Sequence, residues 1–308
     1  MLIEKNVSLS PFTTIKIGGT ARYFASPKSL EELIYALAFA RDKGLGVFVL
    51  GRGANTIFGD FDGLVLHMKA FRELKVQRSG EGFEVFAQAG TSLQELISLA
   101  LKENLEGIYR LAGFPATVGG AVAMNAGAFG VETKDFLKEV FFLDWEGNLH
   151  GVRVEEIPFS YRYSPFPEWG VVVSAVFKFK RTNREVKKEY EAIRKKRKAT
   201  QPLHLPTSGS TFKNPEGEYA GRLLERAGMK GFRVGDVAFS ELHANFLVNL
   251  GEGKFSQVVK IIQEAKKRVF EEFGINFEEE VRLVEGGGTY GWKVSGARDI
   301  FEKRAGGP

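Results

Sequence analysis

Two glycine-rich segments of the chain have the composition of ligand-binding loops. The first, G-R-G-A-N-T at residues 51–56, follows the apolar run 47–50, and its glycines would let successive backbone N–H groups surround an anion. Its spacing matches neither the G-x-G-x-x-G dinucleotide fingerprint nor the P-loop. Taken alone, this segment is equally compatible with a tight turn.

The second glycine-rich segment, residues 111–130, consists almost entirely of small residues. A structural helix or strand would carry larger apolar side chains at regular intervals. We therefore favour a ligand site here, in which the main chain lies flat against a large planar or extended molecule.

Four further segments carry polar side chains that could act on a ligand. Arg162 lies between two tyrosines and could be held rigidly against a carboxylate or phosphate, although a stacked surface arginine fits equally well. The turn at 208–215 offers a hydroxyl, an ammonium and an amide in succession. Taken singly, His243 and the glutamates at 278–280 are more typical of a structural histidine and of a solvated surface.

Several kinds of site are excluded by the residues that the sequence lacks. It has no cysteine, which rules out disulfides, thiolate metal sites and a cysteine nucleophile. The four histidines are scattered, and neither H-E-x-x-H nor G-x-S-x-G occurs, so we expect no metal. No apolar stretch reaches the roughly 18 to 20 residues of a membrane span, and no secretory signal is recognisable. We therefore expect a cytoplasmic protein without a membrane partner.

The composition is that of a folded globular protein. The 308 residues are 44% hydrophobic and 26% charged, and their number suggests about two domains. The net charge of +5 is concentrated in residues 187–198, which hold seven basic and two acidic side chains, so the rest of the chain is formally neutral. A single basic helix is more often a solvated face than a nucleic-acid reader, and we expect no nucleic-acid partner.

Hydrophobic spacing predicts the elements that position these residues. Capping boxes at 29–32 and 92–95 precede apolar residues at helical spacing. Strands are predicted at 47–50, 83–87, 139–144, 171–179 and 244–250. Further helices are predicted at 184–199, 218–227 and 256–273. Because prolines and a charge run coincide near residue 201, we place a domain boundary there, and we expect a loosely attached tail from residue 286.

Taken in order, these segments resemble the MurB family of UDP-N-acetylenolpyruvoylglucosamine reductases, flavoenzymes of peptidoglycan precursor synthesis. The resemblance spans about residues 8–284 and includes the opening T-T-I-K-I-G-G-T-A. The other motifs that carry it are G-R-G-A-N, G-F-P-A-T-V-G-G-A-V-A-M-N-A-G-A-F-G, S-Y-R-Y-S, G-S-T-F-K-N-P, A-G-M-K-G-F-R-V-G, H-A-N-F-L-V-N and E-V-R. The joint signal is specific because so many motifs fall in the family's order.

This resemblance implies an α+β fold. An FAD-binding domain of the vanillyl-alcohol-oxidase/PCMH type would occupy residues 1–200, as two α/β subdomains at about 1–68 and 69–200. A smaller α+β substrate-binding domain would follow at 201–285, and the tail at 286–308. The resemblance to the family's shorter, second type leaves open how the substrate is covered.

The resemblance also assigns site residues. Three positions match the family's catalytic residues: Ser210, Arg162 and Glu280. The FAD contacts would be Gly51, Arg52, Gly53, Ala54, Asn55, Thr56, Gly113, Pro115, Ala116, Thr117, Gly119, Gly120, Asn125, Ala126 and Gly127. The substrate contacts would be Tyr161, Lys213, Asn214, His243 and Asn245.

The implied reaction is the NADPH-dependent reduction of UDP-N-acetylglucosamine enolpyruvate to UDP-N-acetylmuramate. FAD would take hydride from NADPH and pass it from N5 to the substrate. Arg162 would stabilise the charge that develops on the substrate carboxylate, and Glu280 would have to be protonated or orient a proton carrier. Ser210 would deliver the final proton. The expected partners are NADPH and the UDP-sugar, and the protein is expected to be a monomer.

Three positions depart from the family pattern, and one other enzyme class fits part of the chain. Ala116, Phe129 and Glu279 stand where glycine, tyrosine and proline are commoner.

An FAD-dependent oxidoreductase of the same fold that acts on an alcohol or sugar would explain the N-terminal motifs. It would not explain G-S-T-F-K-N-P, H-A-N-F and E-V-R together.

Overall fold

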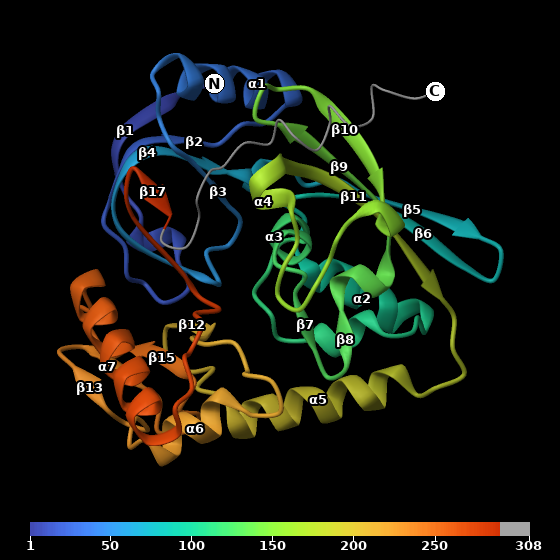
Figure 1. The fold of residues 1–308 in the computed structure, drawn as a ribbon. Helices are drawn as coiled ribbons and strands as arrows, with labels where there is room; N and C mark the ends of the chain where they lie inside the picture. The colour runs from blue at the N-terminus through green and yellow to red at the C-terminus, as the bar shows by residue number, and fades with distance from the viewer. Residues whose placement is uncertain (290–308) are drawn as a thin grey trace, which may run out of the picture.

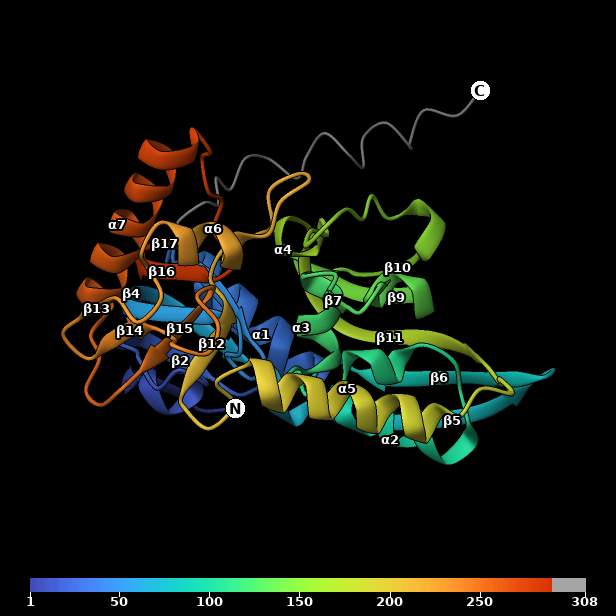
Figure 2. The ribbon, with the colours of Figure 1, turned by 90° about the horizontal axis from the view of Figure 1, so that it is seen from below.

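The computed structural model describes residues 1–289, which form three larger sheets around one central region and one short two-stranded sheet (Figure 1). The first sheet lies at the upper left of Figure 1, the second at the right, and the third at the lower left. Helix α5 (Val186–Thr200) runs from the second sheet to the third, as both views show (Figure 2). No helix in this part of the chain is long and apolar enough to cross a membrane.

The first sheet is built around the long strand β4 (Thr56–His67). Its other strands are β1 (Ile3–Ser8), β2 (Thr20–Ala25), β3 (Val47–Leu50), β16 (Arg282–Gly286) and β17 (Gly288–Thr289). Strands β2, β3 and β16 all run parallel to β4. Helix α1 (Leu30–Asp42) connects β2 to β3 and begins at Ser29, whose side chain accepts a hydrogen bond from the Glu32 N–H.

The second sheet is antiparallel, in the order β10-β9-β11-β6-β5. Its strands are β5 (Leu74–Ser79), β6 (Gly82–Gln88), β9 (Leu137–Asp144), β10 (Leu149–Arg153) and β11 (Gly170–Lys180). Helix α2 (Leu93–Glu103) follows β6 and begins with a complete capping box between Ser92 and Glu95. Buried residues of α1, α2 and the first two sheets form one continuous hydrophobic core.

The third sheet follows α5, in the order β12-β15-β14-β13. Its strands are β12 (Thr207–Ser210), β13 (Arg233–Val234), β14 (Val237–Phe239) and β15 (Phe246–Asn249). They share a core with α6 (Ala220–Arg226), with α7 (Phe255–Phe273) and with Ile15, Ile17 and Ile57 from the first part of the chain. Helix α7 ends at Gly274, whose φ of +68° is the left-handed conformation that glycine adopts without strain.

Short elements complete the described chain. They are α3 (Val118–Ala123), α4 (Phe166–Trp169), β7 (Gly127–Ala128) and β8 (Val131–Glu132). The 3-10 turns are η1 (Ser10–Phe12), η2 (Met68–Ala70), η3 (Ile108–Leu111), η4 (Thr133–Phe136) and η5 (Val154–Glu156).

The structure differs from the predicted organisation at the C-terminal end. Residues 282–285, placed in the substrate-binding domain, belong to the first sheet, because β16 pairs with β4 from Arg282 opposite Thr56 to Gly286 opposite Phe61. The predicted start of the tail at 286 therefore falls inside a strand, and β17 follows it. A glycine triplet suggested a loose segment, but the φ of +67° at Gly286 turns the chain into a hairpin. The rest of the predicted tail lies outside the described residues.

Candidate active site

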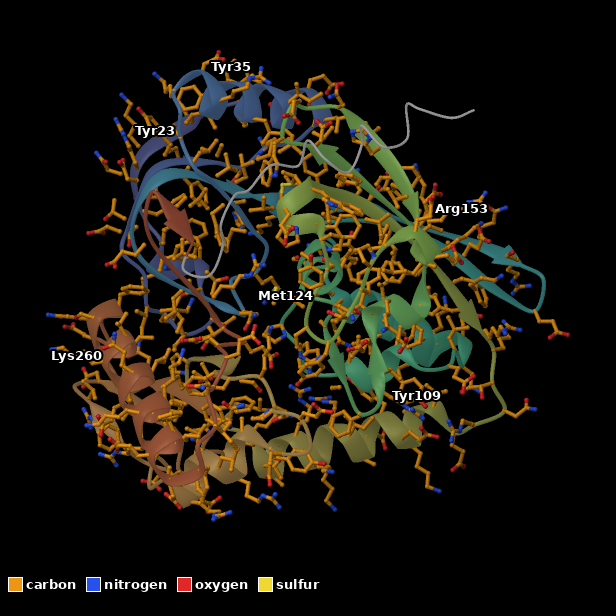
Figure 3. All side chains as sticks on the ribbon, viewed as in Figure 1. Tyr23, Tyr35, Tyr109, Met124, Arg153 and Lys260 are labelled. Carbon is orange, nitrogen blue, oxygen red and sulfur yellow. The ribbon has the colours of Figure 1, made fainter. Side chains whose placement is uncertain are left out.

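Residues of the first and third sheets border a cavity of about 680 Å³, together with loops and helix ends from the part of the chain between those two sheets. One wall is the glycine-rich loop between β3 and β4, and a second is the small-residue segment that contains α3. The end of α5, strand β12 and the segment that leads into β16 supply the third. Met124, at the end of α3, lines this cavity and lies in the middle of the molecule (Figure 3).

The loop 51–56 lies where β3 ends and β4 begins, and all six of its residues line the cavity. Gly53 has a φ of +61°, and a Cβ there would lie 2.2 Å from the carbonyl oxygen of Phe12. Two reasons therefore exclude a side chain at this position: the backbone conformation suits only glycine, and a Cβ would clash with the Phe12 carbonyl. The predicted ligand loop is thus a tight turn whose main chain faces the cavity.

The small-residue segment packs directly against that loop. Thr117 caps α3, with its hydroxyl accepting a hydrogen bond from the Gly120 N–H. A Cβ on Gly51 would lie 2.5 Å from the same hydroxyl. The predicted FAD residues of this segment that line the cavity are Gly113, Pro115, Ala116, Thr117, Gly120, Ala126 and Gly127.

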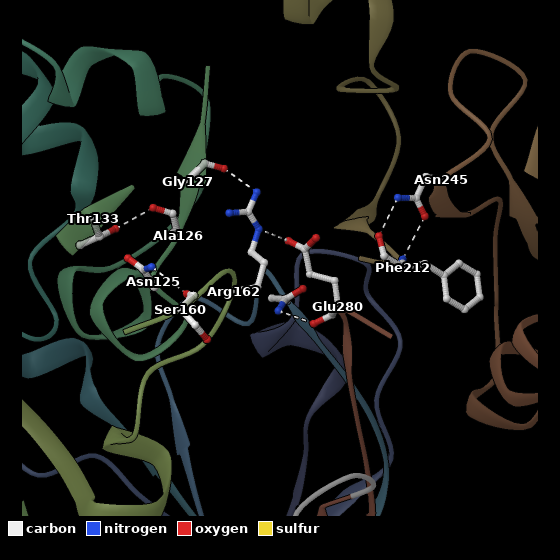
Figure 4. A network of polar contacts seen from close by, with 10 residues as sticks. Asn125, Ala126, Gly127, Thr133, Ser160, Arg162, Phe212, Asn245 and Glu280 are labelled. Atoms are coloured by element: carbon white, nitrogen blue, oxygen red, sulfur yellow. Dashed lines mark hydrogen bonds and ion pairs between the residues drawn. The ribbon is translucent and has the colours of Figure 1, made fainter. Parts of the chain in front are cut away.

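Gly119 and Asn125, also predicted as FAD contacts, lie outside this lining. Gly119 gives α3 room beside β6, because a Cβ there would lie 2.8 Å from Cβ of Ala89. The Asn125 side chain is fully buried and donates a hydrogen bond to Glu132 at 3.0 Å. It donates a second one to the Ser160 carbonyl at 2.9 Å (Figure 4). Both residues support the cavity wall from behind.

Arg162 and Glu280 form an ion pair in the cavity, with 3.0 Å between Nε and Oε1 (Figure 4). A second donor of the guanidinium, Nη2, is 2.7 Å from the carbonyl oxygen of Gly127. The guanidinium also lies over the Tyr161 ring, 4.8 Å from its centre. The Arg162 backbone has a φ of +55°, which is uncommon for a residue with a side chain. These contacts fix the direction of the guanidinium before any ligand binds.

The environment of Glu280 favours its protonated form more than water does. Burial raises the pKa of this carboxyl, and the cations Arg162 and Lys213 oppose that rise. The backbone of Glu280 is held at both ends, since its N–H donates to the Thr211 carbonyl and its carbonyl accepts from the Asn55 side chain. The position of this carboxyl is therefore determined by neighbours from two distant parts of the sequence.

Ser210 is the last residue of β12 and lines the same cavity. It is paired in register with Phe246 of β15, and it follows Gly209, whose φ is +80°. The structure thus brings the three predicted catalytic residues, Ser210, Arg162 and Glu280, to one cavity from three separate elements.

The five predicted substrate residues lie outside the cavity lining. The Lys213 ammonium pairs with Glu278, and Asn214 accepts a hydrogen bond from the Ala220 N–H. The Asn245 amide bridges both backbone groups of Phe212, at 2.9 and 2.8 Å (Figure 4).

The other two residues of this set are aromatic. The Tyr161 ring, 44% exposed, supports Arg162. The His243 ring packs beside Phe246, and burial lowers its pKa. All five side chains surround the elements that carry Ser210 and Arg162.

Sequence reasoning missed Arg197, which it had assigned to a solvated basic face. Arg197 is 5% exposed, lines the cavity and places its guanidinium 4.5 Å from the centre of the Phe114 ring. Burial lowers its pKa to about 10. The signal was available in the spacing, because Arg197 continues the stripe of Val186, Tyr190 and Ile193 along one face of α5.

Gln201, Ser208 and Arg282 were also missed. All three line the cavity. Ser208 opens the turn 208–215 but was given no role of its own, and Gln201 lies outside every motif, so residue type alone gave no reason to select it. Arg282 is half-buried, and the loss of solvent around its guanidinium lowers its pKa to about 10.

The lining residues fit FAD. Among the described residues, three residues that line this cavity each carry a buried polar atom without a hydrogen-bond partner: Arg197 Nε, Gln201 Oε1 and Ser208 Oγ. Such atoms are costly unless a ligand pairs with them, and here they offer a charged donor, an acceptor and a hydroxyl. The opposite wall is of small residues that admit a flat ring, and the volume is that of a cofactor site. Across residues 1–289 no cluster of acidic residues and histidines could hold a metal ion.

Comparison with known proteins also indicates an FAD-binding reductase, and the matches cover most of the chain. The profile of the C-terminal domain of UDP-N-acetylenolpyruvoylglucosamine reductase matches residues 201–284, and that of an FAD binding domain matches residues 21–153. The UDP-N-acetylenolpyruvoylglucosamine reductase of Aquifex aeolicus is 55% identical over 297 residues, which are 96% of this chain and 100% of that protein. The corresponding protein of Caldanaerobacter subterraneus is 39% identical over 91% of this chain and 92% of its own.

A solved structure agrees as well. The crystal structure of UDP-N-acetylenolpyruvylglucosamine reductase (MurB) from Thermus caldophilus superposes with a TM-score of 0.76 at 33% identity, covering 92% of this chain and 99% of that one. The predicted α+β fold with an N-terminal FAD-binding domain is confirmed. On these matches, the chain belongs to the MurB family of UDP-N-acetylenolpyruvoylglucosamine reductases.

Proposed function

We propose that this protein is an FAD-dependent enzyme that uses NADPH to reduce UDP-N-acetylglucosamine enolpyruvate to UDP-N-acetylmuramate. The observation that carries the proposal is the convergence of Ser210, Arg162 and Glu280 on one cavity whose walls fit FAD. Family membership supplies the substrate class, since relatives along the full chain bear the name of this reductase.

The cofactor would be held by main chain and by buried polar atoms. The six residues 51–56 would face its phosphates, the small-residue wall would face its ring, and Arg197 would pair with one of its polar groups. Bound FAD supplies hydride transfer, first from NADPH and then to the substrate. In this arrangement residues 1–200 would carry most of the cofactor contacts, and Gln201 and Ser208 would add two more. The substrate side, including Ser210 and Glu280, would come from the residues that follow.

Three side chains would act on the substrate. Arg162 is a fixed cation, and it would stabilise the negative charge that develops on the substrate carboxylate when hydride is added. Glu280 lies 3.0 Å from Arg162 and has a raised pKa, so its protonated form can donate a hydrogen bond at that carboxylate. Ser210 would give its hydroxyl proton to the α carbon, which is feasible because the carbanion-like intermediate is strongly basic.

The five residues outside the lining would act at the mouth of the cavity or behind it. We assign Tyr161, Lys213 and Asn214 to contacts with the UDP-sugar. We assign His243 and Asn245 to the support of β15 and of the segment around Phe212. We further propose that the enzyme works as a monomer in the cytoplasm, without a nucleic-acid or membrane partner.

A two-stage stopped-flow experiment tests the function. Purified protein with FAD is reduced by NADPH without oxygen and then mixed with UDP-N-acetylglucosamine enolpyruvate, while the flavin band is followed. Rapid reoxidation is expected in the wild type. Ser210→Ala should be reduced at nearly the wild-type rate and reoxidised about 10²- to 10⁴-fold more slowly, the usual contribution of a positioned proton donor. Ser79→Ala, on the exposed strand β5, is the matched control and should change neither rate.

Two results would contradict the proposal. Flavin that is reduced by NADPH but is not reoxidised by the UDP-sugar would favour the other candidate, an FAD oxidoreductase of the same fold acting on an alcohol or sugar. An equal loss in both stages for Ser210→Ala would exclude Ser210 as the proton donor.

A further inference from the structure

Asn55 contacts the segment that carries Glu280 in two ways. Its side-chain amide donates a hydrogen bond to the Glu280 carbonyl at 2.9 Å, and its own carbonyl accepts one from the Arg282 N–H at 2.9 Å. These bonds lie where β16 begins beside β4, with Arg282 opposite Thr56. Asn55 therefore holds the chain on both sides of Val281.

The other end of Glu280 is held by Thr211, the residue that follows β12. The Glu280 N–H donates to the Thr211 carbonyl at 2.8 Å, and the Val281 N–H approaches the same oxygen at 3.3 Å. The Glu280 peptide is thus suspended between the glycine-rich loop and the residue after Ser210. Its side chain projects from this fixed backbone to Arg162.

We infer that Asn55 is a positioning residue for Glu280, in addition to lining the cofactor cavity. The inference rests on the proposed function, since it concerns the step in which Glu280 takes part. The Asn55 amide holds the Glu280 main chain at the distance that lets the carboxyl reach Arg162 and the substrate. This contact also couples the cofactor loop to the proton-transfer residues, because one asparagine belongs to the first and holds the second. Without the amide, the segment 278–281 keeps its bonds to Thr211 but loses its tie to the loop.

A double-mutant cycle tests this role. The two half-reactions are measured in the wild type, Asn55→Ala, Glu280→Gln and the double variant, together with the FAD dissociation constant from flavin fluorescence. Asn55→Ala should slow flavin reoxidation by the UDP-sugar about 10- to 100-fold, as small misplacements of reacting groups do, and slow reduction by NADPH less than about threefold. When Glu280→Gln is already present, adding Asn55→Ala should slow reoxidation by less than about a further threefold.

The pH profile of flavin reoxidation distinguishes a positioning role of Asn55 from a purely structural one, because a purely structural role would leave this profile unchanged. In the wild type, the limb that Glu280→Gln abolishes reports the ionisation of Glu280. Asn55→Ala should displace this limb, because the carboxyl sits differently relative to Arg162. A limb at the wild-type position would contradict the inference.

Asn104 provides a matched control. Its side-chain amide also donates to backbone carbonyls, those of Thr182 and Arg184, but it lies outside the cavity lining. Its φ of +53° makes glycine the suitable replacement. Asn104→Gly should lower the melting temperature and leave the ratio of the two half-reaction rates unchanged.

Other outcomes separate the inference from the proposed function. Failure of the wild type to be reoxidised would refute the function itself. A different result would make Asn55 a cofactor contact alone. In that case the wild type is reoxidised, the effects of Asn55→Ala and Glu280→Gln on the reoxidation rate multiply, and the FAD dissociation constant of Asn55→Ala rises. If Asn55→Ala does not fold, Asn55→Asp replaces the donor by an acceptor of the same size and must show the same selective loss.

Discussion

Replacing Arg197 by methionine should stabilise the protein without FAD and weaken its binding of FAD. Burial lowers the pKa of this guanidinium to about 10, and at about 1.4 kcal/mol per pKa unit the lost solvation of the ion costs about 3 kcal/mol. The ring of Phe114, 4.5 Å away, offsets about 0.5 to 2 kcal/mol of this cost. Methionine has a similar length and no charge, so Arg197→Met should raise the free energy of unfolding by about 1 to 2 kcal/mol.

The assay is urea or thermal unfolding of protein prepared without FAD. The same measurement is repeated after FAD is added, so that the stabilisation by FAD reports its affinity. For a chain of this size, the stabilisation corresponds to an increase of roughly 1.5 to 3 °C in melting temperature. FAD affinity should fall about 10- to 100-fold, because a charged hydrogen bond contributes about 1.5 to 3 kcal/mol. The matched control is Arg194→Met on the same helix, where the guanidinium is exposed and lies 5.7 Å from the Tyr190 ring.

The reasoning fails if the FAD-free Arg197→Met protein is less stable than the wild type. That result would mean that the guanidinium is already stabilised within the protein, and that Arg197 is structural. An unchanged FAD affinity would separate Arg197 from the cofactor even if the stability rises as expected. Arg194→Met should change neither quantity by more than about 0.5 kcal/mol.

Three further substitutions test other contacts of the site. Arg162→Lys keeps the charge but loses the planar guanidinium that bonds Glu280 through Nε and the Gly127 carbonyl through Nη2, so the stopped-flow rate of flavin reoxidation should fall about 10²-fold. Glu280 binds its proton more tightly in the folded protein than in the unfolded chain, so the free energy of unfolding decreases as pH rises through the raised pKa. Glu280→Gln removes this ionisation. Between about pH 5 and 8, urea unfolding should therefore show a smaller loss of stability for Glu280→Gln than for the wild type. Glu278→Gln frees Lys213 from an exposed ion pair, so it should change stability by under about 1 kcal/mol and lower the KM for the anionic UDP-sugar a few-fold at low salt; a higher KM would show that Glu278 orients Lys213.

Elements with strong local signals were predictable from the sequence. The Ser29 and Ser92 caps determine where α1 and α2 begin, because each satisfies backbone N–H groups within its own first turn. The glycine at residue 53 was also informative, since positive φ and a close neighbour leave no alternative. Such features depend on a few adjacent residues and need no knowledge of the rest of the fold.

The use of each polar side chain could not be predicted in this way. Three successive glutamates look alike in the sequence, yet they pair with cations from three different elements: Glu278 with Lys213, Glu279 with Lys266 and Glu280 with Arg162. The partners lie up to 118 positions away along the chain. Periodicity and motif spacing carry no information on contacts of that range.

The same limit applies to residues inherited from the family pattern. Asn245 stands in a motif expected to contact substrate, but its amide is occupied by the backbone of Phe212. Arg197 stands in no motif and reaches the cavity because α5 turns it inward. A motif identifies a position, and only the packing around it shows which atoms are free to meet a ligand.

The path of β16 bears on how the chain can be divided. This strand covers the edge of β4 at residues 56–61, while β3 covers the continuation of that edge from Leu64 to His67. A fragment that stops at residue 200 would expose the backbone donors and acceptors of 56–61, and open edges of this kind recruit other chains. The unit built on the third sheet is therefore an insertion into the first sheet rather than an appendage after it. We therefore expect a fragment of residues 1–200 to fold as a separate module only if β16 is supplied, either fused to it or as an added peptide.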